Sequence, residues 1–119
     1  MKTDASKPMP RQLDLWWASL PEPAGRRPGL LLSRTSAYAY LTRILCVEAT
    51  TTVRGILQEV ALGKREQLPR ACVANLDALG TLPTAALTDR IGRLDGARHV
   101  DVKRALGHAL HWAELTELE

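Results

Sequence analysis

Two polar stretches of the sequence carry side chains suited to holding phosphate groups. The first, GRRPGLLLS, runs from Gly25 to Ser33 and places Arg26 and Arg27 before a proline and an apolar run. The second, EATTTVRG from residue 48 to residue 55, joins three threonines to Arg54. A guanidinium is a planar fork that matches a phosphate, and hydroxyl groups add further hydrogen bonds. Together the two stretches indicate a groove able to hold phosphates and 2′-hydroxyls.

Each stretch also has an interpretation without function. Paired arginines are common in solvated surface loops, and threonine is favoured in strands and turns for its shape alone. Sequence spacing leaves both interpretations open.

The composition is compatible with a nucleic-acid partner. The 119 residues include 16 Lys and Arg against 13 Asp and Glu, a formal net charge of +3, and most of the basic residues are arginines. Arginine enrichment of this kind favours a nucleic-acid partner, but a GC-rich genome gives the same bias.

The chain length and its apolar runs indicate a single domain, from residue 11 to residue 119, behind a flexible tail at residues 1–10. No apolar run approaches the roughly 20 residues that span a bilayer, so no membrane partner is expected. The start, MKTDASKPMP, lacks the apolar core of a signal peptide, which favours a cytoplasmic location. Cys46 and Cys72 lie in apolar runs, so we expect buried free thiols.

Metal and cofactor sites are not expected. His99, His108 and His111 fall in one C-terminal segment, and no cysteine or carboxylate cluster completes a metal site with them. The glycines are isolated, so no nucleotide-phosphate loop is present.

Hydrophobic patterning predicts a mainly β fold. Short apolar runs bounded by turn residues predict strands at residues 13–20, 29–33, 43–49, 56–62, 70–76 and 90–94, and a short helix at 83–90. Short connections between such strands favour a small barrel of twisted antiparallel strands.

The C-terminal segment changes to a helical period. Apolar residues at Val102, Leu106, Ala109, Leu110 and Ala113 predict one helix over residues 97–115, lying across one side of the sheet. Asp95 is expected to cap its start. A glycine at position 107 costs about 1 kcal/mol in a helix, so tertiary packing is expected to stabilise that turn.

Taken in order, four segments resemble the MazF/PemK toxins of bacterial toxin–antitoxin pairs, which are mRNA interferases. These are DLWWASLPEPAGRRPGLLLS, ILCVEATTTVRGILQEVAL, LPRACVANLDALGTL and RIGRL, followed by a closing helix. The resemblance covers residues 11–112. It implies an SH3-like barrel, a homodimer, metal-independent cleavage of single-stranded RNA at short sequences, and inhibition by an antitoxin protein that covers the RNA groove.

The resemblance also implies site residues. The arginine before the proline and the threonine at the end of the third strand carry cleavage in the family, which gives Arg27 and Thr50 here. The expected RNA-binding residues around them are Arg26, Ser33, Thr51, Thr52, Arg54, Asn75 and Asp77. Asn75 stands where some members carry an arginine, and the first loop is shorter than in other members.

Cleavage by attack of a 2′-hydroxyl on the adjacent phosphate fits these residues. Arg27 can stabilise the developing charge and Thr50 can orient the phosphate or the hydroxyl. Arginine has a pKa above about 12 and is a poor proton acceptor, so the general base stays unassigned, with Glu48 and Asp77 as candidates if they face the groove. Two alternatives remain open: a toxin of the same fold that poisons DNA gyrase, and an RNA-binding module without catalysis.

Overall fold

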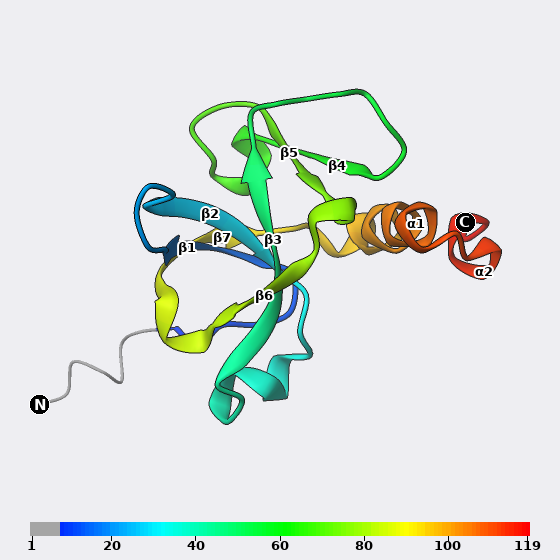
Figure 1. The fold of residues 1–119 in the computed structure, drawn as a ribbon. Helices are drawn as coiled ribbons and strands as arrows, with labels where there is room; N and C mark the ends of the chain where they lie inside the picture. Colours follow the sequence, from blue (N-terminus) through cyan, green and yellow to red (C-terminus); the bar gives the residue numbers. More distant parts are fainter. Residues whose placement is uncertain (1–7) are drawn as a thin grey trace, which may run out of the picture.

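A computed structural model describes residues 8–119, and seven strands within that range form one strongly curled antiparallel sheet (Figure 1). The strands are β1 (Asp14–Ser19), β2 (Arg26–Leu31), β3 (Arg43–Thr50), β4 (Glu59–Leu62), β5 (Cys72–Asn75), β6 (Gly80–Pro83) and β7 (Leu87–Arg93). The order across the sheet is β4-β5-β3-β2-β1-β7, and β6 pairs with β3. Helices α1 (His99–Leu110) and α2 (Ala113–Thr116) close the chain.

Strand β3 runs through the centre of the sheet and has different neighbours along its length. Its first half pairs with β6, its middle with β2, and its last two residues with β5. Ile44 and Cys46 point into one apolar cluster, with Trp16 and Leu31, whereas Val47 points into a second cluster on the opposite face. Successive side chains of a strand point to opposite faces, so β3 contributes to both clusters.

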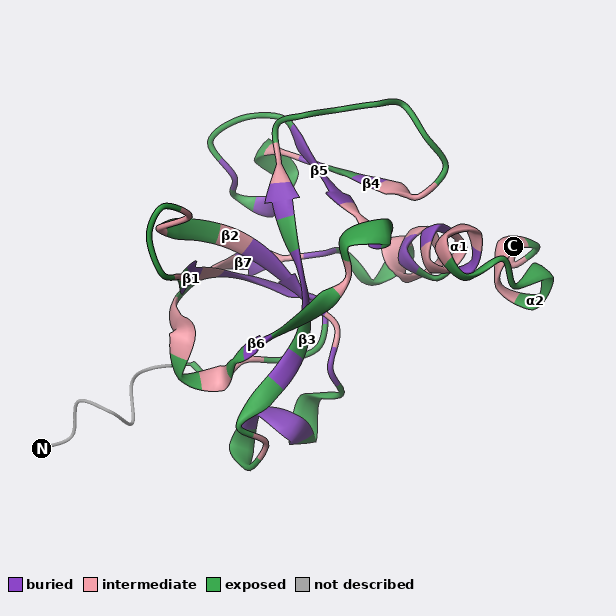
Figure 2. Cartoon of the chain, in the orientation of Figure 1, coloured by how far each residue is buried: buried purple, intermediate pink, exposed green. Residues whose placement is uncertain are grey.

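Helix α1 covers the second cluster beside β4 and the short turn after β5 (Figure 2). Val102 and Ala105 are buried there, and Leu106 and Ala109 pack against them. Arg98, just before the helix, donates to the carbonyl of Ala61 in β4 at 2.7 Å, which fixes the start of the helix to the sheet.

The predicted fold class is confirmed: the chain is mainly antiparallel β with a C-terminal helix. Both cysteines are buried and free, as predicted. Of the predicted tail at residues 1–10, residues 1–7 lie outside the described residues. Within the described range, no helix combines the length and apolar character needed to cross a membrane.

The structure differs from the sequence-based expectations in three places. The helix expected at 83–90 is a short 3-10 turn, Thr84–Ala86, followed by β7, because pairing with β1 holds this segment extended. Strand β6 was not predicted. Arg26 and Arg27 do not lie in a loop, since β2 already begins at Arg26.

The single helix expected over 97–115 is two helices. His111 adopts a left-handed backbone with φ of 58° and ends α1, so α2 turns back against it. A Cβ at Gly107 would lie 2.6 Å from the Cβ of Leu115, so the glycine makes room for α2. Because the helix ends early, Leu110 and Ala113 are exposed instead of buried. Asp95 caps the short turn before α1 by accepting from the amide of Ala97 at 2.9 Å.

Candidate functional site

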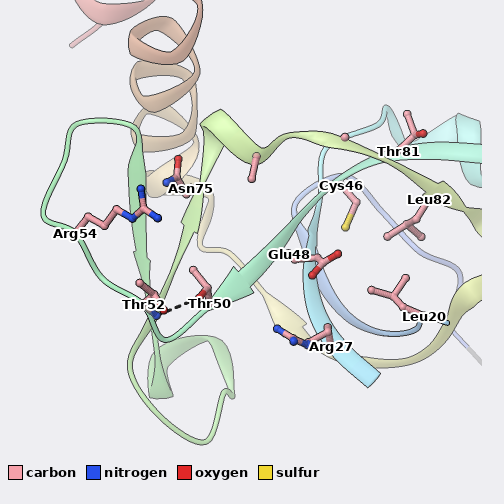
Figure 3. Close-up of a pocket in the computed structure, with 12 residues that line it drawn as sticks. Leu20, Arg27, Cys46, Glu48, Thr50, Thr52, Arg54, Asn75, Thr81 and Leu82 are labelled. Atoms are coloured by element: carbon pink, nitrogen blue, oxygen red, sulfur yellow. Dashed lines mark hydrogen bonds between the residues drawn. The ribbon is translucent and has the colours of Figure 1, made fainter. Parts of the chain in front are cut away.

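A polar groove of about 510 Å³ opens where β3 ends (Figure 3). Its lining comes from four strands, β2, β3, β5 and β6, and from the segments beside them: Leu20, Arg27, Cys46, Glu48, Thr50, Thr52, Arg54, Asn75, Ala78, Gly80, Thr81 and Leu82. The two polar stretches identified in the sequence therefore meet in one place.

Strand register explains why Arg27 and Thr50 meet. Gly29 in β2 lies opposite Glu48 in β3, where the pairing of these two strands ends, and Arg27 and Thr50 each lie two residues beyond that pair on the wall of the groove. Side chains two apart on a strand share a face, so Cys46, Glu48 and Thr50 line the same side of β3. The deeper end of this side is apolar and buried, and the outer end forms the groove wall.

The Arg27 guanidinium keeps most of its donors available. Its Nε donates to the carbonyl of Ala24 at 3.1 Å, which anchors the side chain. Within residues 8–119 its two terminal nitrogens make no hydrogen bond or ion pair. Those nitrogens can bind a phosphate through two parallel hydrogen bonds.

The Thr50 hydroxyl is oriented by its neighbour. Its oxygen accepts from the backbone amide of Thr52 at 3.1 Å, drawn as the dashed line in Figure 3. The hydroxyl proton is then left to donate to a ligand oxygen. Thr50 can therefore act as a donor toward the same phosphate that Arg27 binds.

Arg54 reaches the groove from the loop between β3 and β4. A carboxylate at the start of β4, Glu59, accepts from the backbone amides of Arg54 and Gly55 at 2.9 Å each, and from that of Ile56 at 3.4 Å. These bonds, with the Arg54 amide as the main cause, lower the pKa of Glu59. Glu59 thus fixes the loop that carries Arg54.

Two acidic residues were candidates for a proton acceptor, and only one faces the groove. Glu48 lines it beside Arg27, whereas Asp77 is exposed on the turn Leu76–Ala78 and does not contribute to the lining. Asn75 caps that turn, because its Oδ1 accepts from the Asp77 amide at 2.9 Å. The side-chain amide nitrogen of Asn75 can then donate a hydrogen bond to a ligand in the groove.

Cys46 lies at the deep end of the groove but is not a nucleophile. Burial, with a smaller effect of the Glu48 carboxylate, raises the pKa of the Cys46 thiol to about 12. At neutral pH the group is a neutral thiol, and only a thiolate attacks efficiently.

This geometry and a match to a family model point to the same group of proteins. The model for PemK-like, MazF-like toxins of type II toxin–antitoxin systems matches residues 11–110. The chain belongs to this toxin family.

The MazF-like relatives include several mycobacterial proteins. A probable endoribonuclease, MazF5 of Mycobacterium tuberculosis, is 38% identical over 91 residues, which span 76% of this chain and 83% of that protein. The solved toxin MazF-mt6 from the same organism has a TM-score of 0.76 at 30% identity, covering 82% of this chain and 96% of its own. A mycobacterial endoribonuclease solved in complex with its cognate antitoxin has a TM-score of 0.72 at 27% identity, covering 86% of this chain and 95% of its own. The chain is thus a homologue of MazF endoribonucleases.

The structure separates the residues predicted from the MazF resemblance into two groups. Arg27, Thr50, Thr52, Arg54 and Asn75 line the polar groove, and Thr51 lies just outside it. Glu48 was singled out only conditionally, and the deeper lining from β6 was missed, because β6 itself was not predicted. Alternation along β3, counted back from Thr50, is the sequence signal that identifies Glu48 and Cys46.

Arg26 and Ser33 do not join the groove. The Arg26 guanidinium lies 4.5 Å from the centroid of the Trp17 ring and pairs with Asp89 at 3.0 Å. Ser33 is buried, and its hydroxyl accepts from the Leu45 amide at 2.8 Å. Arg26 therefore joins β2 to β1 and β7, and Ser33 joins the chain after β2 to β3.

Proposed function

We propose that this protein is a metal-independent endoribonuclease that cleaves single-stranded RNA at short sequences, and that it acts as a growth-inhibiting toxin when free of its antitoxin. The observation that carries the proposal is the meeting of Arg27 and Thr50 in one groove, each with donors left for a phosphate. Family membership supports the same activity.

The reaction we propose is attack of a ribose 2′-hydroxyl on the adjacent phosphorus. A new P–O2′ bond forms, the P–O5′ bond breaks, and the products are a 2′,3′-cyclic phosphate and a free 5′-hydroxyl. The 2′-hydroxyl is the nucleophile, so the step needs neither a water nucleophile nor a metal ion, and the departing 5′-oxygen takes its proton from solvent. Arg27 stabilises the added negative charge on the phosphorane, and the Thr50 hydroxyl donates to one of its oxygens.

Glu48 is the residue we assign to remove the 2′-hydroxyl proton. Within the described residues it is the carboxylate that lines the groove, and Arg27 and Thr50 line the same wall. Figure 3 shows its carboxylate on the Arg27 side of the groove. A general base must lie within hydrogen-bond reach of the proton it removes, and we expect Glu48 to come within that reach of an RNA bound through Arg27.

The experiment that tests this function uses a mixed single-stranded RNA and purified protein in EDTA. We expect cuts at a few discrete positions, with 2′,3′-cyclic phosphate and 5′-hydroxyl ends. Thr50→Val, which keeps the shape of the side chain and removes the hydroxyl, and Glu48→Gln should both cut more slowly. Products with 5′-phosphate ends, or activity that appears only with added metal, would refute the proposed reaction.

The partners we propose are an antitoxin protein and a second copy of this chain. A mycobacterial relative has been solved with its cognate antitoxin, and Arg27 and Arg54 outnumber Glu48 in the groove, which favours an acidic occupant. Light scattering of the purified protein should give the mass of a homodimer, and a monomer mass at micromolar concentration would refute that part.

A further inference from the structure

A second, smaller cavity lies on the other side of Arg27 and Thr50. Its volume is about 220 Å³, and both residues line this cavity as well as the polar groove. The rest of the wall is mostly apolar: Trp17, Pro28, Ala49, Leu68, Pro69 and Cys72. Arg27 and Thr50 therefore stand between a polar compartment and an apolar one.

The arrangement of strands creates this cavity. Thr50 is the last residue of β3 to pair with β5, opposite Val73, and the chain entering β5 lies beside the start of β2. Arg70, in that entering segment, is exposed at the cavity, and Thr51 completes its lining. Within residues 8–119 the Arg70 guanidinium makes no hydrogen bond or ion pair.

A nucleobase matches the chemistry of this cavity. Its faces are apolar and its edges carry hydrogen-bond groups, so it suits apolar walls with a donor at the entrance. The volume lies below the roughly 300–1,000 Å³ of sites for drug-sized ligands, which suits a single ring system. A phosphate fits poorly, because most of the lining cannot hydrogen-bond to it.

We propose that this cavity, the base pocket, binds one nucleobase next to the scissile phosphate, and that Arg70 donates hydrogen bonds to the edge of that base. The inference rests on the proposed function, because Arg27 and Thr50 hold the phosphate from which the base extends. The polar groove then binds the sugar–phosphate backbone, and the base pocket selects the sequence.

The test compares cleavage of a randomised RNA pool by the wild type, Arg70→Ala and Thr51→Phe, with Arg65→Ala as the control. Arg65 is also an exposed arginine, and it lies outside both the polar groove and the base pocket. A bidentate contact from arginine to the edge of one base favours that base over the others by about tenfold or more. We therefore expect Arg70→Ala to lower the preference for one base at one position about tenfold.

Thr51→Phe should weaken the same preference by narrowing the base pocket, and Arg65→Ala should retain the wild-type preference. An unchanged preference in both pocket variants would overturn the inference. So would an equal slowing of every sequence by Arg70→Ala, which is the signature of a phosphate contact. Loss of antitoxin binding with RNA preference intact would assign the cavity to a protein side chain instead.

A second measurement separates this inference from the proposed function. A 2′-O-methyl RNA pool cannot be cleaved by 2′-hydroxyl attack, but it can still bind. If the wild type selects one base from this pool through Arg70 and yet leaves unmodified RNA intact, the base pocket stands and the nuclease proposal fails. If it neither binds selectively nor cuts, both fail.

Discussion

The wall of the polar groove depends on a close approach between β2 and β3 at Gly29. A Cβ placed on Gly29 would lie 2.5 Å from the Sγ of Cys46, and the next nearest atoms, two backbone oxygens, are at 3.8 and 3.9 Å. Only the thiol therefore obstructs a larger residue. Overfilling a packed core lowers stability by about 1–3 kcal/mol. Replacing glycine by alanine offsets about 0.4–1 kcal/mol of this loss, because alanine lowers the conformational entropy of the unfolded chain. We expect Gly29→Ala to lower the free energy of unfolding by about 1–2 kcal/mol.

Removing the thiol should reverse this effect. Cys46→Ala alone deletes one buried group, at about 1 kcal/mol. In the double variant the new methyl group of Gly29→Ala occupies the vacated space. The double variant should therefore lie within about 0.5 kcal/mol of Cys46→Ala, a favourable coupling of about 1–2 kcal/mol.

Urea denaturation followed by tryptophan fluorescence measures all three variants, since Trp16 is buried in the same cluster. Gly92→Ala is a matched control, because a Cβ there would meet the backbone carbonyl of Glu66 and no thiol. Cys46→Ala should not rescue it. Additive losses in the Gly29→Ala, Cys46→Ala double variant would refute the packing argument.

Three further predictions concern the supports of the fold and the groove. Asp14→Ala removes a buried carboxylate that accepts at 2.8 Å from an arginine of β7, and it should lower the free energy of unfolding in urea by about 3 kcal/mol. Asp89→Ala, at an exposed ion pair, should lower it by less than about 1 kcal/mol. Equal losses in the two variants would contradict the argument. Folding lowers the pKa of Glu59, so its hydrogen bonds to the loop persist above the ordinary pKa of a glutamate and weaken as the pH falls through the folded value. Protection of the Arg54 amide in hydrogen exchange should therefore fall in acid. Glu59→Gln should remove that pH dependence, and a dependence that persists in the variant would rule out Glu59 as its cause. Gly107→Ala should detach α2, seen as faster exchange over 113–116, whereas a stabilised chain with α2 still protected would contradict the close packing.

Much of the sheet could be predicted from the sequence, because strands β1, β3 and β5 have apolar runs with clear boundaries. Segment 83–90 could not, since its composition suits a helix and only pairing with β1 makes part of it a strand. The left-handed turn at His111 was equally hidden, because no glycine or proline marks it.

The catalytic candidates were found through the family resemblance, and alternation along β3 adds Glu48 to them. The different roles of Arg26 and Arg27 were not predictable, because both are adjacent arginines in one motif. Neighbouring residues on a strand point to opposite faces. One therefore lies on Trp17 and pairs with Asp89, and the other lines the groove.

That difference provides the most direct test of the central claim, that Arg27 stabilises the transition state of metal-independent RNA cleavage. The measurement is the single-turnover cleavage rate in EDTA for the wild type, Arg27→Ala and Arg26→Ala. Removing one preorganised donor to a developing oxyanion costs about 10²–10³-fold in rate, so Arg27→Ala should lose about that much. Arg26→Ala removes the same charge one residue away and should lose far less. Equal losses in the two variants, or a full rate in Arg27→Ala, would contradict the account.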